Sequence, residues 1–367
     1  MYFEKIGLGI KTDDISRSEE IQMNKAFSSL LSEVQAETKE AFCFSCGREV
    51  SSFCNSHLIP RFCLANIGVE GKVTGFNAIL GLPSMGTAIG KEFPGINEAG
   101  TFKMICRECD SSLFQDYENP DNYSDTPPSS KMLAQIAAKN YLKFISKRKA
   151  ELVLSRKSVE KETGDEALSL YLKKKHTVST PVKTDDLDAY ISCFKRAKKC
   201  IDKNTSGYYL VYYNLLDYVA PIAIQSPVSL LIDIEGNVVN DSFSSPTYNP
   251  TDIHVCVFPL HDKTAVILFI NDGDTRYRKF YKQLRKLSEE EQLGVINYMI
   301  FLYCEDYFLA KELPDRIDLA QFKKVAEITP VIWSSTPITD TSLISDQFTL
   351  AKWNTIPNLL SEKHKIR

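Results

Sequence analysis

Two pairs of closely spaced cysteines constrain this chain more than any other feature of its sequence. Cys43 pairs with Cys46, and Cys106 pairs with Cys109, each at C-x2-C spacing. A C-x2-C turn presents two thiolates to one metal ion, and two such turns complete a tetrahedral zinc site. Gly47 follows the first pair directly and suits the tight backbone turn of a zinc knuckle. The sequence therefore predicts a structural Zn²⁺ site with these four cysteines as its ligands.

The other cysteines suit a reducing compartment. The chain has ten cysteines in 367 residues, and its N-terminus lacks the basic and apolar regions of a secretion signal. No stretch approaches the ~20 apolar residues of a membrane span. We therefore expect reduced thiols in a cytoplasmic protein that does not bind a membrane. Cys54 and Cys63 lie between the two pairs, so the replacement of one knuckle cysteine by either of them stays open as an alternative.

A histidine follows Cys46 by eleven positions, in the segment Ser56-His57-Leu58-Ile59-Pro60. The order C-x2-C, Ser-His-Leu-Ile-Pro, C-x2-C-Asp resembles the HNH endonuclease family over residues 41–118. That resemblance implies a ββα-metal fold with the zinc knuckles as its scaffold. It also implies a metal-dependent endonuclease that hydrolyses phosphodiester bonds in nucleic acid, with a role in bacterial defence or in the biology of mobile elements.

The resemblance assigns roles to two residues. His57 would be the general base that activates water, and Asp110 would bind a catalytic Mg²⁺ or Mn²⁺ ion. Neutral imidazole accepts a proton near pH 7, and a hard divalent cation prefers carboxylate oxygen. The sequence departs from the family pattern at Ser56, where an acidic metal ligand is common, and ahead of Cys106, where the Asn that orients the histidine is missing. Asn97 would take the place of that Asn, and Asn55 or Glu118 would supply the missing oxygen ligand.

A second interpretation needs no catalysis. The same cysteines would form a non-catalytic zinc module in a scaffold that binds nucleic acid or protein. In that case His57 would brace its own loop, and Asp110 would be an ordinary N-terminal cap of a helix. A protein partner that binds through the C-terminal region is compatible with both interpretations.

Charge is distributed unevenly along the chain. The formal net charge is only -3, yet residues 131–203 contain eighteen Lys or Arg against nine Asp or Glu. Such a local excess is typical of a surface that binds nucleic acid, and we expect DNA rather than RNA. Residues 276–286 interleave aromatic and basic side chains, as proteins that bind single strands do. The helical spacing of Tyr277, Phe280, Tyr281 and Leu284 nevertheless favours a core face there.

The HNH resemblance implies that a small zinc-stapled ββα-metal (HNH-like) domain comes first. Hydrophobic periodicity predicts that a larger domain of helices and antiparallel sheet follows, so the expected fold class is α+β. In the second domain we expect strands at 208–213, 228–234, 253–259 and 264–270, and helices at 277–287 and 289–308. The expected parts of the chain are an N-terminal helical segment (1–40), the HNH-like zinc domain (41–118), a linker (119–130), a basic helical region (131–206), the antiparallel sheet with helices (207–327) and a C-terminal tail (328–367).

Overall fold

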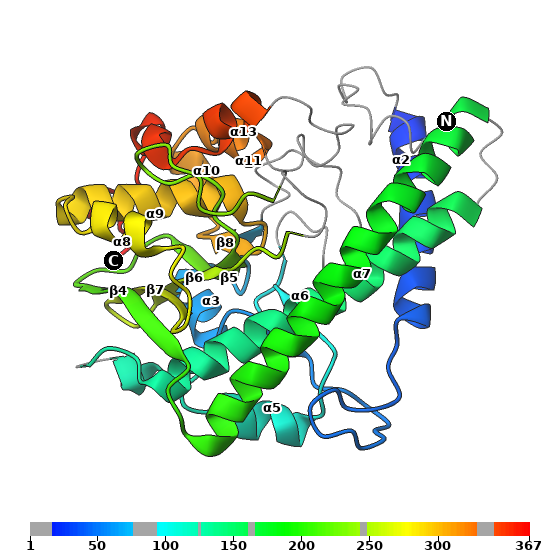
Figure 1. The fold of residues 1–367 in the computed structure, drawn as a ribbon, viewed down its shortest axis with the longest axis horizontal. Coiled ribbons are helices and arrows are strands. Elements are labelled where there is room, and N and C mark those ends of the chain that lie inside the picture. The colour runs from blue at the N-terminus through cyan, green and yellow to red at the C-terminus, as the bar shows by residue number, and fades with distance from the viewer. Residues whose placement is uncertain (1–16, 76–93, 124–125, 161–165, 243–247, 329–340) are drawn as a thin grey trace.

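Figure 1 shows the fold, which is a computed structural model. It describes residues 17–75, 94–123, 126–160, 166–242, 248–328 and 341–367. Helices and one large antiparallel sheet make up the architecture, so the predicted α+β class is confirmed. Among these residues, no helix has both the length and the apolar character that crossing a membrane requires.

A six-stranded antiparallel sheet forms the centre of the fold. Its strands are β2 (Thr74–Gly75), β4 (Tyr208–Leu216), β5 (Ile222–Val228), β6 (Ile253–Pro259), β7 (Thr264–Asn271) and β8 (Tyr307–Leu309). They lie in the order β2-β8-β5-β6-β7-β4, so β2 and β4 are the two edges. β5, β6 and β7 are buried along almost their whole length, which explains their continuous apolar sequences.

Helices pack around this sheet and extend beyond it. They are α2 (Arg17–Glu37), α3 (Arg61–Ile67), α5 (Arg107–Phe114), α6 (Ser130–Glu160), α7 (Glu166–Lys203), α8 (Arg278–Leu284), α9 (Glu289–Tyr303), α10 (Leu313–Arg316), α11 (Ala320–Ala326) and α13 (Thr341–Phe348). In Figure 1, α6 and α7 form a long antiparallel hairpin that projects from the sheet alongside α2. The first half of α6 is buried and contacts β4 and β5. The predicted N-terminal helix is confirmed as α2, and it packs on α6.

The segment around the cysteines has a ββα arrangement. β1 (Ser56–His57) pairs antiparallel with β3 (Thr101–Phe102), and α5 follows. This segment is continuous with the large sheet, because its strand β2 pairs with β8 and its helix α3 contacts β5 and β6. Residues 76–93, between β2 and β3 in the sequence, lie outside the described residues. The buried apolar residues from Cys43 to Leu360 form one core.

Two of the expected elements differ in the structure. The strand expected at 228–234 is replaced by β5, which ends at Val228, and Ile232 makes only isolated bridges. Pro227 lies inside β5 and removes one backbone donor, so this strand carries a breaker in its sequence. The helix expected at 289–308 ends at Tyr303, because Tyr307–Leu309 pair with β5 and β2 instead. A continuous apolar run fits a buried helix or a buried strand equally well.

Candidate metal centre and the neighbouring histidine

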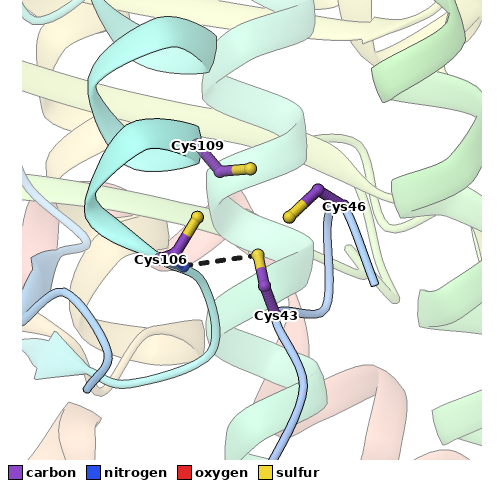
Figure 2. A group of neighbouring side chains, drawn as sticks. All are labelled: Cys43, Cys46, Cys106 and Cys109. Atoms are coloured by element: carbon purple, nitrogen blue, oxygen red, sulfur yellow. Dashed lines mark hydrogen bonds between the residues drawn. The ribbon is translucent and has the colours of Figure 1, made fainter. Parts of the chain in front are cut away.

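The four cysteines predicted as metal ligands lie together. Their sulfur atoms are all within 4.8 Å of one another. Figure 2 shows Cys43 and Cys46 on one loop facing Cys106 and Cys109 at the start of α5, with the sulfurs directed toward a common centre. Gly47 has φ +69° and donates its backbone N–H to the Cys43 carbonyl at 2.8 Å, which closes the knuckle turn. This left-handed conformation is the one that a glycine adopts without strain.

Hydrogen-bond donors surround the sulfur atoms. The backbone N–H of Cys106 donates to the Cys43 sulfur at 3.3 Å, as Figure 2 shows. Arg48 donates from Nε to the Cys46 sulfur at 3.3 Å and also pairs with Glu108 at 2.6 Å. The Arg48 guanidinium lowers the pKa of the Cys46 thiol to about 6, which favours the thiolate that a metal requires. Cationic and N–H donors also offset part of the negative charge of a four-thiolate site.

This donor set fits a tetrahedral metal ion such as zinc. Four thiolates in two turns are the ligands of structural zinc sites, which have no open coordination position. Cys54 and Cys63 are not members of the cluster. The alternative in which one of them replaces a knuckle cysteine is therefore wrong for this arrangement. The Cys54 thiol instead donates to the Asp110 carboxylate at 3.4 Å.

His57 is held by a backbone carbonyl. Its Nε2 donates a hydrogen bond to the Ile96 carbonyl oxygen at 2.9 Å, which places the lone pair of the neutral ring on Nδ1. Among the described residues, no hydrogen-bond partner of Nδ1 is present. Burial lowers the pKa of His57 below its ordinary value of 6.5. The ring is therefore oriented and neutral at pH 7.

The backbone carbonyl of Ile96 orients the His57 ring, which is the role that the sequence pattern assigns to the missing asparagine. Asn97, the substitute considered for that role, instead accepts Arg61 Nε on its side-chain oxygen at 2.9 Å. Asn97 therefore does not bind the His57 ring, and the Asn55 amide donates to the Asn97 backbone carbonyl at 3.2 Å. A backbone carbonyl has no residue preference, so no pattern in the sequence could have identified it.

Asp110 lies at the centre of a buried polar cluster. Its Oδ1 accepts from the Ser56 hydroxyl at 2.6 Å and from the Lys139 ammonium at 2.7 Å. Lys139 also pairs with Glu118 at 3.1 Å and lies 3.9 Å from the centroid of the Phe114 ring. Its side chain is fully buried, although it belongs to the region that the sequence marks as a basic surface. Ser56, Asp110, Glu118 and Lys139 are called the Lys139 cluster below.

Burial and charge act in opposite directions on the two carboxyl groups of this cluster. Burial alone would raise the pKa of Asp110, but the Lys139 ammonium and the hydrogen bonds hold it below its ordinary value. At Glu118 burial prevails and raises the pKa. The burial of Lys139 cannot be predicted from the sequence, because a count of basic residues does not distinguish a buried lysine from an exposed one.

A catalytic Mg²⁺ or Mn²⁺ ion does not fit Asp110 in this arrangement. Both carboxylate oxygens already accept hydrogen bonds, and the Lys139 ammonium supplies the positive charge beside them. A divalent cation would have to displace that ammonium to reach the carboxylate. Ser56, at the other position where the family has a metal ligand, donates its hydroxyl to Asp110.

Much of the charge of the basic helical region is paired within the chain. Basic residues along α6 form ion pairs with acids on α2, in the segment just after α2, on α7 and in the turn after α9. The pairs are Lys147 with Glu305, Arg148 with Asp186, Lys149 with Glu40, Arg156 with Glu37, and Lys157 with Glu33 and Glu37. The charge excess predicted from the sequence therefore serves helix packing to a large extent.

The comparisons with known proteins add no relative. No protein-family model, no curated protein and no solved structure matches this chain. What the site can do is therefore inferred from its own residues: a four-cysteine metal centre, an oriented neutral histidine and a buried ion cluster between them and α6.

Proposed function

We propose that this chain is an HNH-like endonuclease in which Zn²⁺ at the four cysteines holds the scaffold and His57 is the general base. The observation that carries the proposal is the position of His57. It lies on the first strand of a ββα arrangement, its Nε2 is fixed by the Ile96 carbonyl, and its pKa is lowered by burial. A neutral, oriented imidazole beside a phosphodiester would take a proton from water through Nδ1 as that water attacks phosphorus. The bond from phosphorus to the leaving oxygen breaks, and that oxygen takes its proton from solvent.

Zinc supplies folding energy in this proposal and takes no part in the reaction. The proposed reaction does not use Mg²⁺ or Mn²⁺, because Asp110 is already bound to Lys139 and Ser56. DNA is the preferred substrate of the proposal, with RNA as the alternative. The assay below tests both nucleic acids and the need for a divalent ion.

Replacement of His57 by Gln is expected to reduce cleavage at least ~100-fold, the usual contribution of a general base. Glutamine keeps a donor for the Ile96 carbonyl, so the loop should remain folded. The measurement is cleavage of plasmid, single-stranded DNA and RNA in Mg²⁺, in Mn²⁺ and in EDTA, with protein of known zinc content. The matched control is His261→Gln, which changes an exposed histidine in the turn between β6 and β7. Cleavage that survives in His57→Gln, or zinc-loaded protein that cuts none of the substrates, would refute the proposal.

The pH dependence of cleavage should reflect the lowered pKa of His57. A general base works only when unprotonated, so the rate falls as pH drops through its pKa in the folded protein. Because that pKa lies below the ordinary 6.5, the acidic limb of kcat/KM should have its midpoint below 6.5. Initial rates from about pH 5 to about pH 8 locate the midpoint. A midpoint above 6.5 would contradict the assignment of His57 as the base.

One observation favours a non-catalytic alternative. The Lys139 cluster joins α5 and the turn after it to α6 through part-buried ion pairs, which is the arrangement of a structural connection. In that interpretation the zinc unit is a module of a scaffold that binds nucleic acid or protein. His57→Gln would then leave every activity of the protein unchanged, whereas loss of a cysteine ligand would still unfold the unit.

A further inference from the structure

Helix α8 has one buried face and one exposed basic face. Tyr277, Phe280 and Leu284 are buried, at the spacing of residues that share one side of a helix. The predicted core face is thereby confirmed for these three residues. The basic residues of this segment are exposed, and we call them the α8 basic surface: Arg278, Lys279, Lys282, Arg285 and Lys286.

The α8 basic surface is not neutralised as α6 is. Among the described residues, none of its five members forms an ion pair with an acidic side chain. Residues 275–288 contain six Lys or Arg and no Asp or Glu. The acids that flank them are otherwise engaged: Asp274 accepts the backbone N–H of Arg276, and Glu291 caps α9 through Ser288. Glu289 and Glu290 also lie in the first turn of α9.

Two tyrosines lie beside these cations. Tyr209, on the edge strand β4, is 47% exposed and packs edge-to-face on Tyr281, with ring centroids 6.1 Å apart. The two hydroxyls are 3.2 Å apart. Arg285 donates to the Tyr281 hydroxyl at 2.7 Å, and its guanidinium carbon lies 5.2 Å from the centroid of that ring. An exposed aromatic ring therefore adjoins a row of unpaired cations.

We propose that the α8 basic surface and Tyr209 bind single-stranded nucleic acid. The Lys and Arg side chains would contact phosphates, and the Tyr209 ring would stack on an unpaired base. A duplex keeps its bases stacked inside, so it could use the cations but not the ring. The proposal deepens the proposed function, on which it rests for its ligand class. β4 and β2 are the two edges of the large sheet, and the segment that contains His57 joins this sheet through β2, so the α8 basic surface lies toward the other edge.

The test is fluorescence anisotropy with labelled oligothymidine, oligouridine and a duplex, each of about 20 nucleotides or base pairs. The binding protein carries His57→Gln, so that no strand is cut. The charge variant Arg278→Gln/Lys282→Gln/Lys286→Gln is expected to bind single strands at least ~10-fold more weakly. Three lost phosphate contacts should also reduce the slope of log Kd against log salt by about 2. Tyr209→Ala should weaken binding about tenfold at an unchanged slope, whereas Tyr209→Phe should bind normally.

The matched control removes the same charge elsewhere. Lys25→Gln/Lys173→Gln/Lys174→Gln changes three exposed lysines, one on α2 and two near the N-terminal end of α7. In Figure 1, α2 and this end of α7 lie on the side of the molecule away from α8. Equal weakening by both triple variants would overturn the proposal, as would tighter binding of the duplex or no binding of either single strand. Comparison of oligothymidine with oligouridine tells DNA from RNA. Binding without cleavage would refute the nuclease alone, and cleavage without binding at α8 would refute this proposal alone.

Discussion

Loss of one cysteine ligand is expected to unfold the segment from Cys43 to Phe114. Structural zinc contributes roughly 10–16 kcal/mol of apparent binding free energy, as much as the whole stability of a typical domain. The short strands β1 and β3, of two residues each, have few bonds of their own to replace it. Hydrogen exchange followed by mass spectrometry should show lost protection over residues 43–59 and 101–118 in Cys43→Ser and in chelator-treated protein.

The control for this experiment is Cys193→Ser, a half-buried thiol on α7 outside the four-cysteine cluster. It should keep both its zinc content and its protection pattern. Peptides from β6 and β7 serve as an internal reference, because these strands are buried in the large sheet. If Cys43→Ser kept native protection after its zinc had been lost, the metal would not be what holds this segment.

Lys139→Met is expected to destabilise the protein by about 3 kcal/mol, at the lower end of the cost of breaking a buried ion pair. The lower end applies because the Asp110 and Glu118 side chains are 17% and 31% exposed. Methionine fills similar space but leaves two carboxylates without their shared cation. Urea unfolding measures the change. The control Lys131→Met removes an exposed pair with Asp116 from the same helix, and should cost at most about 1 kcal/mol.

A second variant and a pH series separate the loss of charge from the loss of packing. Lys139→Met/Asp110→Asn/Glu118→Gln removes all three charges and should recover much of the stability. In the wild type the lowered pKa of Asp110 adds stability above the ordinary pKa of 3.8, and this is lost as pH falls through the folded-state value. In Lys139→Met both carboxyls should titrate above their ordinary values, so acidification stabilises it relative to the wild type. If the difference in unfolding free energy between the wild type and Lys139→Met stayed constant with pH, Lys139 would stabilise the protein through packing and not through its charge.

The parts of the structure that the sequence predicted are those encoded by local spacing. The C-x2-C pairs, the helix α2 and the buried face of α8 depend on residues within one or two turns of each other. The positions of β6 and β7 follow from apolar runs that a short turn separates. The prediction of the metal centre also assumed that the two knuckles, which are far apart in the sequence, lie together in the fold. The reason was that each C-x2-C turn supplies two of the four ligands of a tetrahedral zinc site.

The parts that the sequence did not predict depend on contacts between distant segments. A count of charge along the sequence places Lys139 on the surface, because its partners lie far away in the sequence, Asp110 on α5 and Glu118 in the turn after it. The orientation of His57 comes from a backbone carbonyl at Ile96, which any residue could supply. β5 was missed because a proline interrupts its sequence, and β8 because its apolar residues continue those of a helix. In each case the tertiary partner decides the role of the residue.

The pairing of strand β2 limits whether residues 41–118 could be transferred to another protein by recombination. It adds an edge to the large sheet by pairing with β8, while α3 covers β6 and Asn66 donates to the Pro259 carbonyl at 3.0 Å. Excision of residues 41–118 would leave β8 with unpaired backbone groups and uncover apolar side chains on β6, a template for aggregation. Residues 41–118 therefore cannot be transferred alone to another protein. A recombination that preserves the fold must transfer the large sheet together with them.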